Sequence, residues 1–342
     1  PSNSPEGKNG MSGRFFNMKA NESLHINITT GQSSPSGELE GGLGCGLLLS
    51  VLIPTFDHKC YTLVAELQRQ LEAAGCGYEI IVADDGGRDQ VCAIANLRIN
   101  ELPQCRFIRR RENAGRAAIK NFLAREARGE WLLFIDSDAE VTDPHYIRRL
   151  LDAISDAGGT QVIIGGLRHA DTMPSPEVSL RYLYEKEADR HRTARERSIQ
   201  PYRHMTPFNL CVRHSVMRTI TFDEQCREYG YEDALFGVTL QQNGIGVTHI
   251  DNPLLHTGLE NNAVYLAKAE TALRTLHSLG DRMMRHSHVG QAAITLQRWH
   301  VKGLAALLFR VFRPIMRRNL LGKKPSLTVF SLYKLGYLCT IS

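Results

Sequence analysis

One short stretch of the sequence limits the possible folds more than any other. Residues 131–135 are five apolar residues in a row, and Asp136 and Asp138 follow them at once. A run of this kind predicts a strand that is buried on both faces, as in a parallel sheet. Ligands of open α/β sheets bind just beyond the carboxyl ends of the strands. Two carboxylates on the turn there can converge on one divalent cation, since hard cations prefer oxygen ligands.

A helix N-cap is the alternative use for these two carboxylates. The next predicted helix, however, already has Asp143 as a cap and Pro144 at its first position. We therefore favour a metal site at Asp136 and Asp138.

Strand and helix patterns alternate along the first half of the chain. The predicted strands cover residues 47–53, 78–83, 106–108, 131–135 and 161–164, and the helices between them cover residues 61–74, 90–98, 117–127 and 146–154. Such alternation predicts an α/β fold in which helices cover both faces of a mostly parallel, Rossmann-like sheet.

The pattern loosens after Pro174. We predict one long polar helix over residues 177–197, an added strand over 209–212, a helix over 232–242 and a strand over 246–250 that leads to His256. Beyond Ala263 the spacing is helical to about Arg318, with breaks expected near Gly290 and Pro314.

The first 46 residues differ from the rest of the chain. They are rich in Ser, Gly and Asn and have no apolar periodicity, so we predict disorder there, with a short strand near residues 25–28. The other residues, in a chain of 342 that is 42% hydrophobic, suffice for one large globular domain or two.

Basic residues are concentrated near the end of the chain. Residues 282–342 hold 11 Lys and Arg and no Asp or Glu, so the remainder carries 30 bases against 36 acids, a net charge of −6. A nucleic-acid-binding domain would have a basic body, and we therefore expect no nucleic-acid partner. A basic tail on a mildly acidic body suits contact with an anionic surface instead.

Apolar residues of this tail recur at helical spacing from Ile294 to Ile315, with bases and Trp299 between them. The pattern predicts an amphipathic helix, which could rest on an anionic membrane or pack against the preceding domain. No apolar stretch of about 18 residues is present, so we expect no membrane-spanning helix. The eight cysteines include no Cys-x-x-Cys pair. This favours reduced thiols and a cytoplasmic protein, with room for peripheral binding to the inner face of the membrane.

Two predicted strands end in acid pairs, Asp84-Asp85 and Asp136-x-Asp138. Because the carboxyl ends of parallel strands meet at one edge of a sheet, we expect the four carboxylates to surround one pocket.

A basic helix start lies between these pairs in the sequence. Gly115 precedes Arg116 and Lys120, and such a helix start can receive phosphate oxygens. This basic helix start and a metal bound by the acids would together form a site for a nucleoside diphosphate. A solvated helix face explains the two bases equally well.

Glu232 and Asp233 open a later predicted helix. Helix starts favour acids through the helix dipole, so a purely structural role is open. The functional interpretation is a general base that takes a proton from an acceptor hydroxyl.

These features occur as six motifs. In chain order they are Pro54-Thr55, Asp84-Asp85-Gly86-Gly87, Asn113-x-Gly115, Asp136-Ser137-Asp138, Phe222-Asp223-Glu224 and Glu232-Asp233. Their order and spacing over residues 47–257 resemble the family 2 glycosyltransferases, which have the GT-A fold. The resemblance implies an inverting enzyme of polysaccharide or cell-envelope biosynthesis. It would move a sugar from a nucleotide sugar donor, which we expect to be a UDP-sugar, to a hydroxyl of a glycan or lipid-linked acceptor.

The resemblance also implies roles for individual residues. Those that bind the nucleotide sugar are Pro54, Thr55, Phe56, Asp84, Asp85, Arg116, Lys120 and Asp136. Asp138 would hold a divalent metal, Mn²⁺ or Mg²⁺, with His256 as a second ligand, although a structural role for this histidine stays open. Asp233, with Glu232 beside it, would activate the acceptor hydroxyl, and Asn209 would help line the acceptor side.

Three motifs depart from the family pattern. The usual Asp-Gly-Ser is Asp-Gly-Gly at residues 85–87. The usual Ala-Arg-Asn is Ala-Ile-Lys-Asn at residues 118–121, so the phosphate contact would come from Lys120 or Arg116. Processive synthases carry Gln-x-x-Arg-Trp, but Thr295 stands at the glutamine position before Arg298 and Trp299. This difference favours an enzyme that adds a single sugar.

The implied organisation has three parts. They are a disordered segment (residues 1–46), a GT-A catalytic domain (47–260, with a nucleotide-binding half over 47–140 and an acceptor half over 141–260) and a basic helical tail (261–342).

Three alternatives remain open. A haloacid-dehalogenase-type phosphatase would need Thr or Val where Glu140 stands, and a sugar nucleotidylyltransferase would need a Gly-rich loop after the first strand. A nucleotide-sugar-binding protein without activity is disfavoured because Asp138 and Asp233 are both present.

Overall fold

The computed structural model describes residues 48–203, 205–226 and 229–341. The chain divides into two compact units, residues 1–42 and 43–342, and every described residue belongs to the second. The disorder predicted for residues 1–46 and the strand predicted near residues 25–28 lie outside the described residues.

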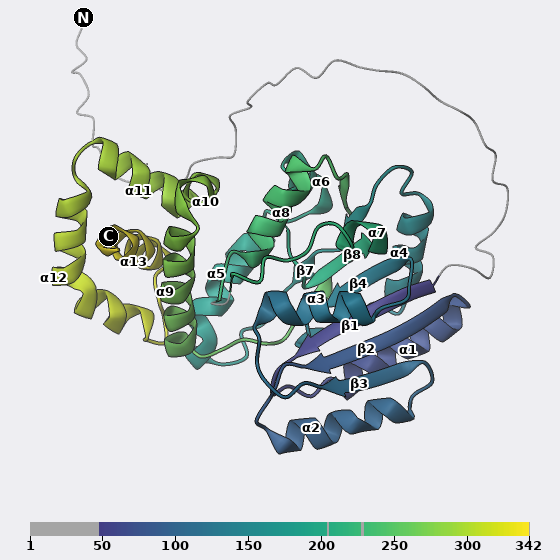
Figure 1. Ribbon diagram of the computed structural model, residues 1–342. Helices are drawn as coiled ribbons and strands as arrows, with labels where there is room; N and C mark the ends of the chain where they lie inside the picture. Colours follow the sequence, from purple (N-terminus) through teal and green to yellow (C-terminus); the bar gives the residue numbers. More distant parts are fainter. Residues whose placement is uncertain (1–47, 204, 227–228, 342) are drawn as a thin grey trace, which may run out of the picture. The chain divides into compact units, whose positions relative to one another are not determined.

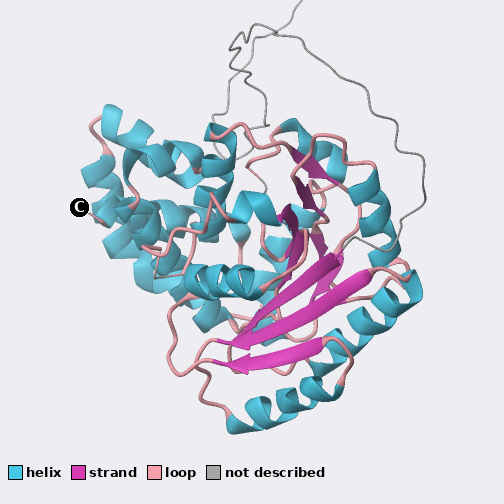
Figure 2. Cartoon of the chain, turned by 45° about the vertical axis from the view of Figure 1, so that its right-hand side comes forward, coloured by secondary structure: helices cyan, strands magenta, loops and turns pink. Residues whose placement is uncertain are grey.

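A seven-stranded sheet forms the centre of the second unit (Figures 1 and 2). Its strands, in spatial order, are β3 (Cys105–Arg109), β2 (Gly77–Asp84), β1 (Leu48–Thr55), β4 (Trp131–Ile135), β8 (Asn209–Arg213), β6 (Val162–Ile164) and β9 (Val247–His249). Strand β8 runs antiparallel to both of its neighbours, and the other neighbouring pairs are parallel. The predicted α/β fold with a mostly parallel sheet is therefore confirmed.

Helices cover both faces of this sheet because the side chains of its strands alternate between two apolar layers. On β1, Val51 and Ile53 face one layer and Leu52 faces the other. The first layer holds α1 (Tyr61–Ala74) and α4 (Tyr146–Ser155), and the second holds α3 (Arg116–Glu126), α7 (His214–Met217) and α8 (Glu232–Gln242). Helix α2 (Gln90–Leu97) and the 3-10 turn η1 (Arg98–Glu101) pack beside β3.

A second sheet of three short strands joins distant parts of the chain. It consists of β5 (Ala139–Glu140), β10 (Leu254–His256) and β7 (Leu167–Arg168). His256 pairs with Ala139, and this pairing brings His256 beside Asp138. Strands of two or three residues are too short to show periodicity, which is why the sequence does not predict them.

The prediction of one long helix over residues 177–197 is wrong. The segment forms the 3-10 turn η2 (Pro176–Val178), helix α5 (Ser179–Asp189) and helix α6 (Ala194–Ile199). A capping box starts α6: the Thr193 hydroxyl accepts the Glu196 N–H, and the Glu196 carboxylate accepts the Thr193 N–H. This Thr-x-x-Glu signal is visible in the sequence and marks a new helix.

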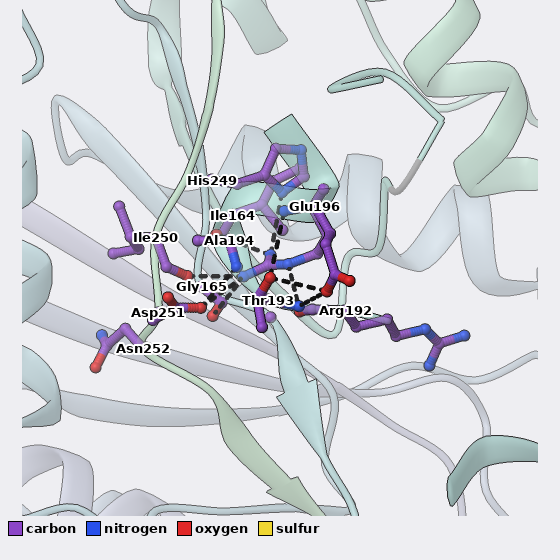
Figure 3. Close-up of polar contacts among 12 residues, drawn as sticks. Ile164, Gly165, Arg192, Thr193, Ala194, Glu196, His249, Ile250, Asp251 and Asn252 are labelled. Atoms are coloured by element: carbon purple, nitrogen blue, oxygen red, sulfur yellow. Dashed lines mark hydrogen bonds and ion pairs between the residues drawn. The ribbon is translucent and has the colours of Figure 1, made fainter. Parts of the chain in front are cut away.

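Arg197 on α6 explains why this break suits the fold. Its guanidinium is buried and donates to the carbonyl oxygens of Arg192 at 3.0 Å and Ile250 at 2.8 Å. It also contacts the carbonyl of Ile164 at 3.3 Å and Nδ1 of His249 at 3.0 Å. These partners belong to three segments: the end of β6, the end of β9 and the residues that lead into α6. Figure 3 shows the three segments close together. One side chain thus fastens the loops around residues 165–203 to the main sheet.

The rest of the described chain is helical. It forms α9 (Asn262–Ser278), α10 (Gly280–His286), α11 (His288–Arg298), α12 (Lys302–Leu320) and α13 (Leu327–Thr340). The break predicted near Gly290 is present, because the chain leaves the helix at Ser287 between α10 and α11, but the break predicted near Pro314 is wrong, since Pro314 lies inside α12. Gly290 permits close packing at this break, because a Cβ there would collide with the backbone of Met284. The amphipathic stretch is divided at residues 299–301, where His300 adopts a positive φ of 59°.

The cap predicted at Asp143 and Pro144 also needs correction. Helix α4 begins at Tyr146, and the Asp143 carboxylate accepts the N–H of His145 at 2.9 Å. Asp143 therefore stabilises the turn before the helix, with Pro144 in that turn.

Replacing Arg197 by Lys should lower the free energy of unfolding by about 2–4 kcal/mol, because an ammonium group cannot reach all of the acceptors and leaves buried carbonyls unpaired. The measurement is the urea midpoint at constant slope. Arg195→Lys is the matched control, since Arg195 lies exposed on the same helix. Equal midpoints for the two variants would show that the Arg197 contacts do not stabilise the fold.

Candidate active site

The carboxyl ends of β1, β2 and β4 meet at one edge of the main sheet. Thr55 ends β1 beside Asp84, the last residue of β2, and β4 pairs with β1 on the other side. Asp85 and Asp136 directly follow β2 and β4. The acids that the sequence singles out therefore come together at this edge, as expected.

A pocket opens there, which we call the first pocket. Its lining residues are Pro54, Thr55, Phe56, His58, Asp85, Asn113, Gly115, Arg116, Ile119, Lys120, Asp136, Ser137, Asp138, Tyr229 and Lys268. Every residue predicted to bind the nucleotide sugar is among them except Asp84. Their roles stay predictions, but the fold brings them to one place.

Asp85 is held firmly in this pocket. Its carboxylate pairs with Arg110 at 2.7 Å and accepts the backbone N–H groups of Ala114 at 3.2 Å and Gly115 at 2.9 Å. Gly115 has a φ of 93°, a backbone conformation that favours glycine. The Asn113-x-Gly115 motif thus shapes the loop that grips Asp85.

Asp84 does not line the pocket. Its carboxylate accepts the N–H of Gly87 at 3.0 Å and lies 3.7 Å from Arg109. Gly86, two residues after Asp84, has a φ of 73°, and a Cβ there would meet the backbone of Asn113 at 2.6 Å. The structure places Asp84 in the turn below the pocket, away from the base or ribose contact that we expected.

An ion cluster lies at the wall of the first pocket, where the side chains of Lys120 and Glu232 are buried and that of Arg116 is 46% exposed. The Glu232 carboxylate is 2.6 Å from Nε of Arg116 and 3.8 Å from Nζ of Lys120. Arg116 also pairs with Asp136 at 3.2 Å. Burial would raise the pKa of Glu232, but the charges of Lys120 and Arg116 hold it below the usual value. Glu232 does not line the first pocket and lies beneath the two cations.

Lys120 is the unusual member of this cluster. Its side chain is only 1% exposed, and Nζ has no hydrogen-bond partner among the described residues although it borders the first pocket. Burial and the neighbouring Arg116 lower the pKa of Lys120. A buried ammonium without a hydrogen bond is costly, so this corner of the pocket favours an anionic ligand.

A second pocket adjoins the first. The two share Arg116, Asp136, Asp138, Tyr229 and Lys268 as a common wall. The other lining residues of the second pocket are Gly166, Leu167, His169, Arg181, Glu185, Arg192, Arg197, Arg203, Met205, Thr206, Phe208, Asp233, His256 and Glu260. Asp85 and Asp138 thus line one pocket, and Asp138 and Asp233 line the other.

Asp233 differs chemically from its neighbour Glu232. Burial and the adjacent charge of Glu232 raise the pKa of Asp233 to about 6. Such a carboxylate is mostly ionised at neutral pH and still basic enough to accept a proton.

Asp138 and His256 meet across the second pocket. Oδ2 of Asp138 lies 3.1 Å from Nε2 of His256, whose Nδ1 lies 3.1 Å from Nε2 of His169. Nδ1 of His169 in turn contacts the Asp189 carboxylate at 3.0 Å. The guanidinium of Arg181, which only donates, also lies 3.3 Å from Nε2 of His256. With Nε2 of His256 as an acceptor, neutral rings in this chain carry their protons on Nδ1. The lone pair of His256 Nε2 then faces the Asp138 oxygen, and a cation between them would suit both atoms.

The donor set therefore fits a divalent metal such as Mn²⁺, which binds carboxylate and imidazole ligands. Within residues 48–203, 205–226 and 229–341, no cluster of three or more His, Cys, Asp and Glu side chains is placed to hold an ion. The protein would thus supply Asp138 and His256, and a bound ligand would supply further oxygens.

Several pocket residues are absent from the sequence prediction. The centre of the Tyr229 ring lies 6.0 Å from the guanidinium of Arg116 and 5.2 Å from the ammonium of Lys268. Lys268 belongs to α9, in the segment that we predicted to be the tail. His169 and Arg181 flank His256. No motif marks these residues, because only the fold brings them to the site.

Asn209 does not line the acceptor side, contrary to expectation. Its side chain is buried, accepts from the Tyr146 hydroxyl at 2.8 Å and donates to the carbonyls of Gly166 and Asn252 at 2.9 Å each. Asn209 therefore braces the loops beneath the second pocket.

Known proteins resemble this chain in sequence and in fold. An uncharacterized glycosyltransferase of Haemophilus influenzae is 29% identical over 91 residues, which are 27% of this chain and 29% of the relative. The succinoglycan biosynthesis protein ExoO of Rhizobium meliloti is 30% identical over 129 residues, which are 38% of this chain and 35% of that protein. The matched region thus spans about a third of each of these relatives.

Two solved structures illustrate the likeness in fold. The mannosyltransferase PcManGT from Pyrobaculum calidifontis, in complex with GDP-Man and Mn²⁺, has a TM-score of 0.49 at 14% identity, over 85% of this chain and 84% of that one. S. aureus TarS 1–349 in complex with UDP-GlcNAc has a TM-score of 0.45 at 17% identity, over 67% of this chain and 66% of that one.

The family comparison covers half of the chain. Residues 50–220 match the family described as "Glycosyl transferase family 2". They include β1 to β4, the start of α3 and the Asp136-Ser137-Asp138 turn. The resemblance seen in the sequence motifs is therefore confirmed, and the chain belongs to glycosyl transferase family 2.

Proposed function

We propose that the protein is an inverting glycosyltransferase. It moves a sugar from a nucleoside diphosphate sugar, which we take to be a UDP-sugar, to a hydroxyl group of a glycan or lipid-linked acceptor. The observation that carries this proposal is the wall shared by the two pockets, which includes Arg116, Asp136 and Asp138. A donor in the first pocket and an acceptor in the second would meet at this wall.

The first pocket has the chemistry of a nucleotide sugar site. Phe56 is 48% exposed at its rim and offers a flat apolar surface to a base. The fixed carboxylate of Asp85 can accept hydrogen bonds from base or ribose. Arg116 and the buried ammonium of Lys120, whose Nζ forms no hydrogen bond within the described part of the chain, supply positive charge for a diphosphate.

Asp138 and His256 would hold Mn²⁺ or Mg²⁺ in this proposal, since their donor atoms already face each other. A divalent ion bound there would stabilise the negative charge on the departing diphosphate. His169 and Asp189 keep the His256 ring in place through the hydrogen-bond chain.

Asp233 is the proposed general base. It accepts the proton of the acceptor hydroxyl while the acceptor oxygen forms a bond to the anomeric carbon of the sugar. The bond between that carbon and the diphosphate oxygen breaks, and the electron pair leaves with the nucleotide. Lys120 and Arg116 stabilise this leaving group electrostatically. A single displacement inverts the anomeric configuration, and no covalent sugar–enzyme intermediate forms.

Glu232, which the resemblance places beside Asp233 as a catalytic residue, has a different role in this proposal. Its carboxylate binds Arg116 and Lys120 from behind. We assign it as a positioning residue that orients the two cations and raises the pKa of Asp233.

Family membership argues against the phosphatase and nucleotidylyltransferase alternatives. The relative in Rhizobium meliloti is described as a succinoglycan biosynthesis protein, which supports polysaccharide biosynthesis in the cell envelope as the setting. An acceptor carried on a lipid would place the reaction at the cytoplasmic face of a membrane.

Two substitutions test the proposed roles through UDP release from UDP-sugars. Asp233→Asn should lower turnover about 10²–10⁴-fold and leave UDP affinity within a few fold, because the base contacts only the acceptor. Asp138→Ala should lower both turnover and Mn²⁺-dependent UDP affinity. Asp152→Asn, an exposed acid on α4, is the control. Full turnover by Asp233→Asn would exclude Asp233 as the base.

The reaction should also show an acidic limb in its pH profile. The base acts when ionised, so kcat/KM should fall about tenfold per pH unit below the pKa of Asp233, which is about 6. Glu232→Gln removes a neighbouring negative charge and should move this limb to lower pH. The comparison uses variants with the circular dichroism spectrum of the wild type. A limb that stays in place would argue against the coupling of Glu232 and Asp233.

A further inference from the structure

A row of apolar side chains lies exposed along α12. It consists of Leu304, Leu307, Leu308, Val311, Phe312 and Ile315, which are between 48% and 68% exposed. Their spacing alternates between three residues and one, so they occupy a single face of the helix. We call this row the α12 face. Trp299, 61% exposed, lies just before α12.

The opposite side of α12 is packed, so the exposed face does not belong to a loose helix. Phe309 and Leu320 are buried in an apolar cluster with Phe330 and Tyr333 of α13. Arg313 and Arg317 turn toward α9, where each contacts the carboxylate of Glu270. In Figure 1, α12 lies at the outer edge of the C-terminal helices, on the side away from the main sheet.

Exposed bases border the α12 face. They are Arg298, Arg310, Arg318, Lys323 and Lys324. The sequence from Arg282 to Ser342 contains no Asp or Glu that could neutralise them. The face is therefore apolar along its centre and positively charged at its borders.

The apolar centre and the basic borders of the α12 face favour one of two kinds of partner. A second copy of the chain would bring two sets of bases together without acids from the same segment to pair with them, which disfavours association. An anionic lipid surface offers both a hydrocarbon layer for the apolar row and negative headgroups for the bases. Tryptophan beside such a helix is typical of membrane interfaces. Every helix in the described part of the chain is too short or too polar to cross a bilayer.

We propose that the α12 face docks on an anionic lipid bilayer, with α12 in the plane of the membrane and its apolar row at the boundary between headgroups and acyl chains. The inference rests on the exposed face and its charges and is independent of the proposed reaction. Docking would hold the two pockets near lipid-linked acceptors.

The first test is sedimentation of the full chain with vesicles of phosphatidylcholine, alone or mixed with phosphatidylglycerol. The wild type should bind the anionic vesicles, and added salt should weaken the binding. Leu307→Gln/Val311→Gln/Ile315→Gln should weaken it at least about tenfold. Val91→Gln/Ile94→Gln on α2, where both residues are exposed, is the apolar control. Binding of the triple variant at wild-type strength would overturn the proposal.

A second pair of variants tests the charges. Arg310→Gln/Arg318→Gln should lower affinity for anionic vesicles about tenfold or more and leave weak binding to neutral vesicles unchanged. Arg195→Gln/Arg218→Gln removes two exposed bases outside the tail and should have little effect. Equal loss in both double variants would mean that net charge alone drives binding, which also contradicts a docking face on α12.

Tryptophan fluorescence gives a readout that reports the orientation directly. The chain has two tryptophans, of which Trp131 is 1% exposed and Trp299 is 61% exposed. Anionic vesicles should shift the emission of Trp299 to shorter wavelength, and Trp299→Phe should abolish the shift. An unchanged spectrum, or a dimer in light scattering that the triple variant converts to monomer without any vesicle binding by the wild type, would refute membrane docking. If the wild type binds anionic vesicles but turns over no UDP-sugar, this result would count only against the proposed reaction.

Discussion

The candidate site depends on an ion cluster that joins two helix starts. Arg116 opens α3 and Glu232 opens α8, and their side chains meet at 2.6 Å. Helix N-termini carry partial positive charge, and Arg116 and Lys120 add two full charges. Glu232 and Asp136 compensate them from opposite sides. Lys120 and Glu232 are buried, and removing one partner of a buried ion pair typically costs about 3–5 kcal/mol, because the other charge is left unpaired. The cluster thereby ties the start of α3 to the start of α8.

The same charge balance gives two adjacent acids different chemistry. Glu232 takes the direct contacts with both cations, and these charges hold its pKa low. Asp233 lines the second pocket beside a neighbour that is already ionised, and its pKa rises to about 6. The two adjacent carboxylates thus have different surroundings: Glu232 is the counter-ion of two cations, and Asp233 lines the second pocket with a raised pKa.

The second sheet and the C-terminal helices complete the site from far along the sequence. Pairing of β10 with β5 brings His256 to Asp138, across 118 residues. Helix α9 supplies Lys268 to both pockets, and Arg197 fixes the loops beside them. The segment predicted to be a tail is therefore part of the site at its beginning and presents an apolar, basic-edged face on α12.

Three features can be predicted from the sequence alone. They are the alternating strands and helices, the sheet edge at which Asp85 and Asp136 lie, and the division between a mildly acidic body and a basic tail. Such features depend on the periodicity and turn chemistry of neighbouring residues, which a reader can follow along the chain. The Thr-x-x-Glu box before α6 belongs to the same class and was visible, although the polar helical spacing around it hid the break.

Other features follow from the packing of distant segments. Glu232 lies beneath Arg116 and Lys120, Asp84 stabilises a turn, Asn209 braces loops, and one face of α12 is covered. These outcomes depend on contacts between residues that lie far apart in sequence, such as the 116 residues between Arg116 and Glu232. Contacts of this range leave no periodic trace in the sequence, because they arise when separate elements pack together and compete for the same buried space.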